Sequence, residues 1–188
     1  MDCSVFMVFC GDLNRLNRLN SKRSYRFNGE FTESFLLAVV DTTLVASRAL
    51  LAAQALGLGG VMVGGIRNHP EVVSNLLELP RLVFPIMGMS LGIPRSEARI
   101  KPRLPVEAVS FKEKYSESAM ADSIAEYDQT IKALGYLNGR EVEPEKYPDF
   151  EGDYLWSEHT ARRMASEKKT TQRPHLLKYL QDRGLLKK

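Results

Sequence analysis

The residues from Gly29 to Leu56 constrain the fold more than any other part of this chain. On a helical projection, apolar residues occupy nearly every direction of this stretch. A helix that is apolar on all sides is either central to its fold or lies in a subunit interface. Polar residues such as Asp41 and Arg48 interrupt the stretch, so it predicts a core helix and not a membrane span. If Asp41 is buried, it must be paired or hydrogen-bonded, and Arg48 or a partner chain could supply that partner.

A short apolar strand between two glycine pairs follows directly, in the sequence GLGGVMVGGIRN from Gly57 to Asn68. Glycine allows a backbone to turn with positive φ, or allows another molecule to lie close against it. The strand exit at Gly64 and Gly65 is therefore a candidate ligand surface. The alternative is that Gly57 ends the helix and that Gly64 and Gly65 form a loop, with no ligand involved. Spacing alone favours this second interpretation.

Two further strands are predicted, from Ser4 to Cys10 and from Val83 to Leu91. Pro85 lacks a backbone N–H and favours a sheet edge or a bulge at its position. The segment 14–28 is polar and is expected to be a loop. Further helices are predicted at residues 70–77, 118–134, 156–169 and 174–183. Strands among helices, without regular alternation, predict an α+β layer fold.

Composition excludes several classes of protein. A chain of 188 residues with 44% hydrophobic content can form one domain with its own core. Its 26 Lys and Arg nearly balance its 23 Asp and Glu, so neither a nucleic acid nor a membrane is expected as a partner. The two cysteines, Cys3 and Cys10, fit a reducing cytoplasm, and the N-terminal residues do not form a secretory signal.

No familiar catalytic set is present. The three histidines, His69, His159 and His175, are scattered, and no HExxH, paired CxxC or GxSxG motif occurs. We therefore predict no metal site and no catalytic side chain, so that difficult chemistry would belong to a bound organic cofactor. Lys101 and Arg103 lie on a proline-stiffened loop, KPRLP, and can bind one phosphate together. The alternative is a solvated basic pair beside a turn.

Taken in order, these segments resemble those of the nitroreductase superfamily, and within it the oxygen-insensitive NADPH nitroreductases and NADPH-flavin reductases. The similarity covers nearly the whole chain. It is carried by SVFMVFCGDLNR, VVDTTLVASRALLAAQALGLGG, VMVGGIRN, MGMSLGIP, KPRLP, EYDQT and RPHLLKYLQDRGL. The resemblance implies a single nitroreductase-like domain over residues 1–188, with a mixed sheet flanked by helices around a long central helix.

The resemblance also implies a cytoplasmic FMN enzyme that forms a homodimer, with flavin at the subunit interface. NADPH would reduce the flavin, leave, and be replaced by a nitroaromatic, a quinone or free flavin, in ping-pong order. The cofactor-binding residues implied are Met62, Val63, Gly64 and Gly65 along the flavin ring, and Lys101 and Arg103 at its phosphate.

Two arginines are implied as NADPH contacts. Arg140 is the nearest match to an arginine that family members carry on a mobile loop, here residues 138–155. This loop is longer and more acidic than is usual in the family. Arg173, directly before Pro174, is the second candidate, and a structural role at a helix start is the alternative.

The family's N-terminal helix and HRSxR-like flavin motif have no counterpart in this sequence. The resemblance therefore implies a domain that is incomplete at its N-terminus and binds FMN weakly or not at all. We expect that purified protein does not retain stoichiometric flavin through gel filtration. The alternative function is a non-enzymatic remnant that dimerises through the 29–56 helix and binds no flavin.

Overall fold

The computed structural model describes residues 3–96, 100–140, 152–165 and 172–188. The chain divides into two compact units. The sheet unit comprises Met1–Glu97 and Gln172–Lys188, and the helical unit comprises Ala98–Thr171. Each unit is described by itself.

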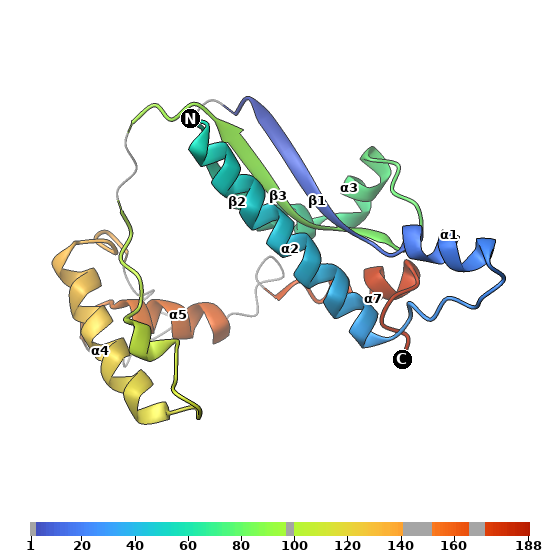
Figure 1. Cartoon of the computed structure of the whole chain (residues 1–188). Coiled ribbons are helices and arrows are strands. Elements are labelled where there is room, and N and C mark those ends of the chain that lie inside the picture. The colour runs from blue at the N-terminus through green and yellow to red at the C-terminus, as the bar shows by residue number, and fades with distance from the viewer. Residues whose placement is uncertain (1–2, 97–99, 141–151, 166–171) are drawn as a thin grey trace. The chain divides into compact units, whose positions relative to one another are not determined.

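The sheet unit is built on three strands: β1 (Val5–Asp12), β2 (Gly59–Val63) and β3 (Val83–Gly92). Their order is β1-β3-β2, and both pairings are antiparallel (Figure 1). The α+β class is therefore confirmed. The mixed sheet that we expected is not found among the described strands, which pair only in the antiparallel sense.

Pro85 lies in the central strand, so the prediction of an edge position is wrong and the prediction of a bulge is confirmed. Phe9 of β1 pairs with Met87, but the next residue, Cys10, pairs with Pro85. Ile86 is the extra residue on β3. A central strand tolerates proline at such a point because the ladder is already interrupted there.

The bulge also keeps the apolar side chains of β3 on one face. Side chains of a regular strand alternate between faces, so residues 84 and 89 would point in opposite directions. In the structure Phe84 packs with Ala38 and Met89 packs with Ala46, and both alanines lie on helix α2 (Thr32–Ala55). The extra residue, Ile86, shifts the alternation by one, so that Phe84 and Met89 point to the same face of the sheet.

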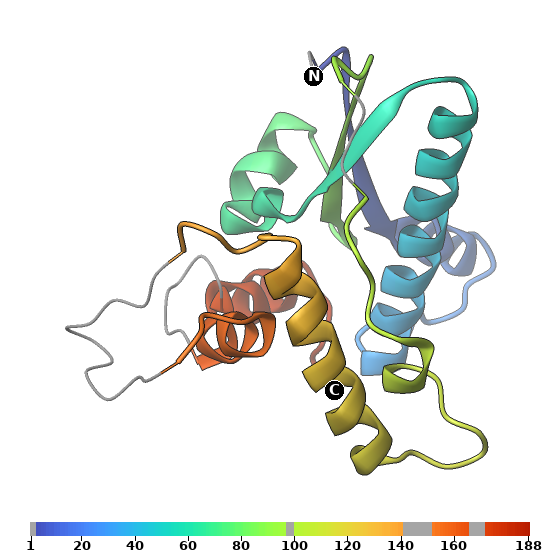
Figure 2. The ribbon, with the colours of Figure 1, turned by 90° about the vertical axis from the view of Figure 1, so that its left-hand side faces the viewer.

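Helix α2 runs along one face of the sheet, and α3 (Pro70–Leu76) lies on the other (Figure 2). The buried residues of α2 are all small: Ala38, Ala46 and Ala53. Its large apolar residues are mostly exposed in this chain, among them Leu36, Leu37, Val40, Leu44, Val45 and Leu51. Helix α2 is central as predicted, but within this chain only the face that carries the alanines is buried.

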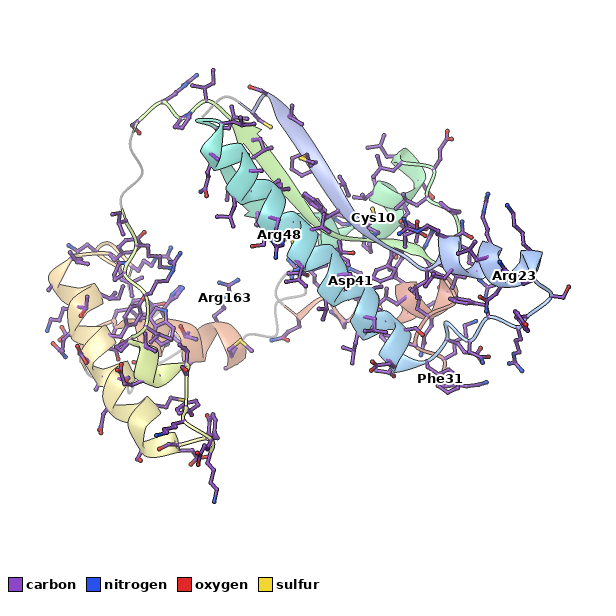
Figure 3. The ribbon with its side chains drawn as sticks, in the orientation of Figure 1. Cys10, Arg23, Phe31, Asp41, Arg48 and Arg163 are labelled. Atoms are coloured by element: carbon purple, nitrogen blue, oxygen red, sulfur yellow. The ribbon has the colours of Figure 1, made fainter. Side chains whose placement is uncertain are left out.

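Two polar features of α2 follow from that exposure. Asp41 is exposed, so it needs no buried partner, and Arg48 lies two turns further along the helix (Figure 3). By length and composition α2 is also apolar enough to cross a membrane, although only 17% of the relevant window is buried. The central helix of a soluble protein passes the same test, so this finding alone assigns no membrane.

Residues 14–28 contain a helix where a loop was predicted. Helix α1 (Asn14–Lys22) follows β1 directly. The carboxylate of Asp12 accepts a hydrogen bond from the backbone N–H of Arg15 at 3.1 Å, which satisfies a donor at the start of the helix. Leu13, at the same end, is buried. An acidic residue before a Leu-x-x-Leu pattern was the signal for this helix.

The C-terminal helix α7 (His175–Asp182) completes the sheet unit. The hydroxyls of Tyr179 on α7 and Ser74 on α3 share a buried hydrogen bond of 2.6 Å. Leu180 of α7 packs into the same core as Phe84 of β3. The predicted helices at residues 70–77 and 174–183 are thus confirmed to within a residue at each end.

In the helical unit, α4 (Glu117–Ala133) packs against α5 (Trp156–Ala165). The buried carboxylate of Asp128 on α4 accepts hydrogen bonds from the backbone N–H and the hydroxyl of Ser157, at the start of α5. The rings of Tyr127 and Trp156 meet edge to face at 5.1 Å. The Tyr127 hydroxyl also donates to the Pro102 carbonyl at 3.0 Å, which ties the KPRLP loop to α4. Of the predicted helix 156–169, residues 166–169 lie outside the described residues.

Candidate functional site

The predicted flavin surface begins where β2 ends. Met62 pairs with Met89 and Val63 with Gly88, the last pairs of the β2–β3 ladder. Beyond them, residues Gly64–Asn68 form a short 3-10 turn, which we call the glycine segment. The segment therefore leaves the sheet directly beside the central strand.

Glycine at position 65 is not required by the fold. Neither Gly64 nor Gly65 has a positive φ, whereas Gly57 has a φ of +79° and ends α2. A Cβ added at Gly65 would meet nothing closer than Val63 Cγ1 at 3.9 Å. The backbone here is open to a ligand, which fits the close approach of a flat ring. The alternative interpretation is correct that Gly57 ends the helix and that Gly64 and Gly65 lie in a turn, but that turn does not require glycine at position 65.

Side chains from three elements hold the glycine segment. The guanidinium of Arg67 donates to the carbonyl of Ile86, the extra residue of the β3 bulge. Its Nη2 atom lies 3.1 Å from the position that a Cβ would take at Gly64. Burial, and after it the charge of Arg173, lowers the pKa of Arg67. A half-buried cation thus ties the segment to the irregular point of the sheet.

The entry to α7 supplies the other two contacts. Arg173 Nε donates to Asn68 Oδ1 at 2.8 Å, and His175 Nε2 donates to the Arg67 carbonyl at 3.1 Å. Arg173 has a φ of +47°, a costly conformation for arginine that its surroundings must maintain. The structure thus places Arg173, predicted from the sequence, beside Asn68 of the glycine segment.

The helical unit holds two further predicted residues, Lys101 and Arg140, in a group centred on His159 of α5. Arg140 Nη1 lies 3.3 Å from His159 Nε2, and the Tyr154 hydroxyl lies 2.8 Å from His159 Nδ1. We call Lys101, Arg140, Tyr154, His159 and Arg163 the histidine cluster. Arg163 projects from α5 one turn beyond His159 (Figure 3).

The hydrogen bonds of His159 define its tautomer. Arginine can only donate, so Nε2 accepts from Arg140 and carries no proton. Nδ1 then carries the proton and donates to the Tyr154 hydroxyl. Burial, and then the charges of Arg140, Arg163 and Lys101, lower the pKa of His159. All of this favours a neutral imidazole surrounded by cations.

Lys101 and Arg103 differ in their surroundings. The ammonium of Lys101 lies over the Tyr136 ring, 5.5 Å from its centroid. Its charge also contributes to the lowered pKa of His159. Arg103 is exposed on the same loop. Within the helical unit, the charges of both Lys101 and Arg140 lower the pKa of His159. That these residues share one site with Gly64 and Gly65 stays a prediction.

Sequence reasoning missed six residues of these two groups: Arg67, Asn68, His175, Tyr154, His159 and Arg163. Arg67 and Asn68 belong to the motif GLGGVMVGGIRN, and His175 follows Arg173-Pro174, so their proximity to predicted residues was a usable signal. His159 and Arg163 gave none, because only the packing of α5 against α4 brings them near Arg140.

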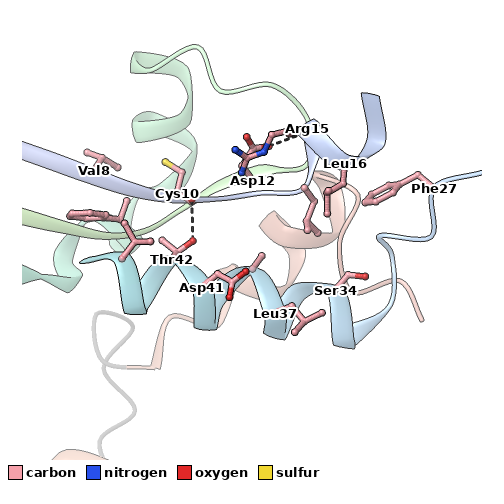
Figure 4. Close-up of a pocket in the computed structure, with 14 residues that line it drawn as sticks. Val8, Cys10, Asp12, Arg15, Leu16, Phe27, Ser34, Leu37, Asp41 and Thr42 are labelled. Carbon is pink, nitrogen blue, oxygen red and sulfur yellow. Dashed lines mark hydrogen bonds between the residues drawn. The ribbon is translucent and has the colours of Figure 1, made fainter. Parts of the chain in front are cut away.

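A separate pocket of about 670 Å³ lies between β1, α1 and α2 (Figure 4). Asp12, Arg15 and Asp41 contribute its charged groups, and none of the predicted site residues lines it. Thr42 donates to the Cys10 carbonyl at 3.2 Å, and burial raises the pKa of the Cys10 thiol. In the described part of the chain, no three His, Cys, Asp or Glu residues gather closely enough to hold a metal ion.

Comparison with known proteins identifies the family. Residues 21–93 match the family model described as the nitroreductase family, and residues 101–188 match that of the nitroreductase family, C-terminal domain. The chain belongs to the nitroreductase family, as the sequence motifs predicted.

Several relatives align along almost the whole chain. The NADPH-flavin oxidoreductase of Vibrio harveyi is 37% identical over 183 residues, which are 97% of this chain and 69% of that protein. The oxygen-insensitive NADPH nitroreductase of Salmonella typhimurium is 36% identical, over 95% of this chain and 67% of the relative.

Solved structures agree with this assignment. The NADPH:FMN oxidoreductase of Vibrio harveyi, solved in complex with NAD+, superposes with a TM-score of 0.78 at 36% identity. Nitroreductase A of Vibrio parahaemolyticus gives a TM-score of 0.80, also at 36% identity. Each match covers 97% of this chain and 68% of the solved chain. The predicted nitroreductase-like fold is confirmed.

Proposed function

We propose that this chain is an FMN-dependent NAD(P)H oxidoreductase that reduces nitroaromatics, quinones or free flavin. The relatives named above are an NADPH-flavin oxidoreductase and an NADPH nitroreductase, and another at 38% identity is an FMN reductase of Bacillus subtilis. The single structural observation that carries the proposal is the open backbone at Gly65, where the fold does not require glycine.

When bound, FMN supplies the two-electron chemistry between NADPH and the acceptor. The chain's own contribution is binding and orientation. Gly64 and Gly65 present a backbone without side chains to the flavin ring, with Met62 and Val63 leading into it. Lys101 and Arg103 bind the phosphate, and Arg140 and Arg173 contribute to NADPH binding.

The two units together form one nitroreductase-like domain in this proposal. The two family matches leave only a short stretch between them, and their order is that of the chain. The mobile loop expected at residues 138–155 falls mainly on residues 141–151, which lie outside the described residues, so its role stays a prediction.

A homodimer is the second part of the proposal. Leu44 and Val45 of α2 are 56% and 60% exposed, and Leu36, Leu37, Val40 and Leu51 extend the same apolar surface along the helix. Contiguous apolar surface of this kind marks an interaction site. A second copy of the chain is the occupant we propose, in a cytoplasmic protein that needs neither a membrane nor a nucleic acid as partner.

The function is tested by adding FMN to the purified chain and following NADPH oxidation with a quinone or a nitroaromatic acceptor. We expect oxidation that depends on both FMN and acceptor, and that Gly65→Val abolishes. NADPH oxidation at the rate of free FMN alone would contradict the proposal. Gel filtration of the same protein tests the expectation that FMN is not retained in stoichiometric amount.

The dimer is tested by sedimentation velocity of Leu44→Asp. We expect a shift from dimer to monomer, because the charge lies within the proposed interface. Leu177→Asp on α7 is the matched control, since Leu177 is 55% exposed and Leu44 is 56% exposed. A monomeric wild-type protein, or equal sedimentation of wild type and Leu44→Asp, would contradict the interface.

A further inference from the structure

The outer edge of β1 is not protected against pairing with another strand. β1 lies at one side of the sheet and pairs with β3 along one edge only (Figure 1). Its first five residues, Val5–Phe9, are all apolar, and Val5 and Phe6 are 52% and 48% exposed. Edge strands of soluble proteins are normally protected by lysine, by proline or by a bulge in the strand, and this run contains none of them.

Two observations at the end of β1 show which of its backbone groups face outward. Thr42 of α2 donates to the Cys10 carbonyl, so this carbonyl points away from β3 (Figure 4). The residue opposite Cys10 is Pro85, which has no N–H to donate. Backbone groups alternate along a regular strand, so those of Phe6 and Val8 also face outward. In the described part of the chain, no hydrogen bond outside the ladder to β3 involves either residue.

The pocket between β1, α1 and α2 adjoins this edge. Its lining includes Val8, Phe9 and Cys10, and its volume of about 670 Å³ is typical of a ligand pocket. Phe9 packs with Ala46 of α2. Residues opposite each other on paired strands share a face, so the side chain of an added residue opposite Phe9 would point toward α2 and into the pocket. The strand edge and the pocket therefore form one surface.

The charged groups of the pocket favour a basic side chain in the partner. Asp12 and Asp41 contribute two carboxylates, and Arg15 contributes one guanidinium. The Asp41 carboxylate is exposed and forms no hydrogen bond or ion pair among the described residues. A second copy of β1 cannot supply the base, because Val5–Asp12 contains neither lysine nor arginine. The surface therefore fits a strand of different sequence.

We propose that the outer edge of β1 binds an extended apolar segment of a different polypeptide, which adds antiparallel to β1 as a fourth strand and places a basic residue beside Asp41. Backbone hydrogen bonds to Phe6 and Val8 provide affinity, and the pocket selects the side chains. Both existing pairings of the sheet are antiparallel, which is also the slightly more stable form. The proposal does not depend on flavin or NADPH binding.

The probe is a fluorescently labelled peptide of about seven residues that alternates valine and threonine, since strands of this length are common. It carries one arginine near its N-terminus, the end that an antiparallel strand brings to Asp41. We expect saturable one-to-one binding to the full chain, measured by fluorescence anisotropy. A peptide of the same composition with its arginine at the C-terminus should bind about threefold to tenfold more weakly. Absence of binding, or equal affinity of the two peptides, would overturn the proposal.

Two changes test strand pairing itself. N-methylation of alternate peptide amides should abolish binding when the methyl groups face β1 and should leave it unchanged when they face away. Val8→Pro removes an outward N–H that the ladder to β3 does not use, so it should keep the fold and weaken binding at least about tenfold. Chemical unfolding checks the fold of the variant. If it does not fold, the methylated peptides still decide, since equal effects of the two would exclude strand pairing.

Two further variants test the charge and the choice of partner. Asp41→Asn should remove the preference for the N-terminal arginine, whereas Asp122→Asn, at an exposed aspartate of α4, should preserve it. Without peptide, Leu44→Asp should sediment as a monomer. If Leu44→Asp still associates, and Val8→Pro in the same chain prevents this, the edge binds a second copy and the proposed partner is wrong.

Discussion

The glycine segment and the histidine cluster differ in what holds them. In the sheet unit, Arg67 and His175 bond to backbone carbonyls and Arg173 bonds to Asn68, so the backbone itself is fixed. In the helical unit, Arg140 and Tyr154 bond to a side chain, and Lys101 and Arg163 contribute charge. The first arrangement suits recognition by shape, and the second suits recognition by charge, which salt and pH can change.

Gly65→Val tests recognition by shape at the glycine segment, and we expect it to have the largest effect of these variants. A branched side chain would occupy the open backbone, so we expect FMN affinity to fall about 100-fold, equivalent to about 2.7 kcal/mol. The fold should be unaffected, because the added Cβ meets only Val63 at 3.9 Å. Fluorescence titration of FMN and thermal unfolding measure the two quantities.

Gly60→Ala is the control for that variant. Its added Cβ would lie 2.6 Å from Leu50 Cδ1 and 2.7 Å from Leu91 Cδ2, so it should destabilise the protein by about 1 to 2 kcal/mol through overpacking. Flavin affinity at Gly65→Val equal to that of wild type would refute the role given to this backbone.

Arg67→Met tests whether the segment depends on its attachment to the β3 bulge. Loss of a charged hydrogen bond to the Ile86 carbonyl should lower the free energy of unfolding by about 2 kcal/mol. Amide hydrogen exchange should accelerate at Gly64–Asn68 more than in α2, and FMN affinity should fall about tenfold. Arg18→Met should change none of these. Unaltered exchange in the segment would show that other contacts hold it.

Lys101→Met tests recognition by charge at the histidine cluster. Because Lys101 is exposed, thermal stability should stay at the wild-type value, in contrast to Arg67→Met. FMN affinity should fall about threefold to tenfold, and the dependence of that affinity on salt should become shallower. A salt dependence identical to that of wild type would mean that Lys101 does not contact the anion.

The smallest effect concerns pH. The pKa of His159 is lowered in the folded state, so its contribution to stability is complete above the ordinary histidine value. It is lost as the pH falls through the ordinary value toward the lowered one. Chemical unfolding at about pH 7.5 and about pH 5 should show a smaller acid loss for His159→Asn than for wild type. Equal losses would mean that His159 is not held neutral.

The sequence predicted the helices around the sheet and the bulge at Pro85 because proline and periodic apolar residues act locally. It could not show that β3 is central, since that depends on which strands pair with it. Helix α1 was missed, although Asp12 and the leucines that follow it are a pattern that predicts a helix. The sequence did not show that one face of α2 is exposed, because a helical projection counts alanine and leucine equally as apolar. In the structure, only alanines of this helix are buried against the sheet.

The site was predicted in the same uneven way. Motifs pointed to Gly64, Gly65, Lys101 and Arg173, each of which lies in a short recognisable segment. Arg67 was missed because its role arises from the carbonyl at Ile86, which exists only once β3 has its bulge. The neutral state of His159 depends on its burial and on the charges of Arg140, Arg163 and Lys101, and no short motif contains all four residues.

Helix α2 turns its alanines inward and its leucines and valines outward, and this reverses the usual location of apolar surface in a small protein. In the proposed dimer that surface leaves water only when two copies meet, so association supplies part of the folding free energy. The melting temperature should then rise with protein concentration. Dilution of such a protein therefore lowers its stability, as a denaturant does.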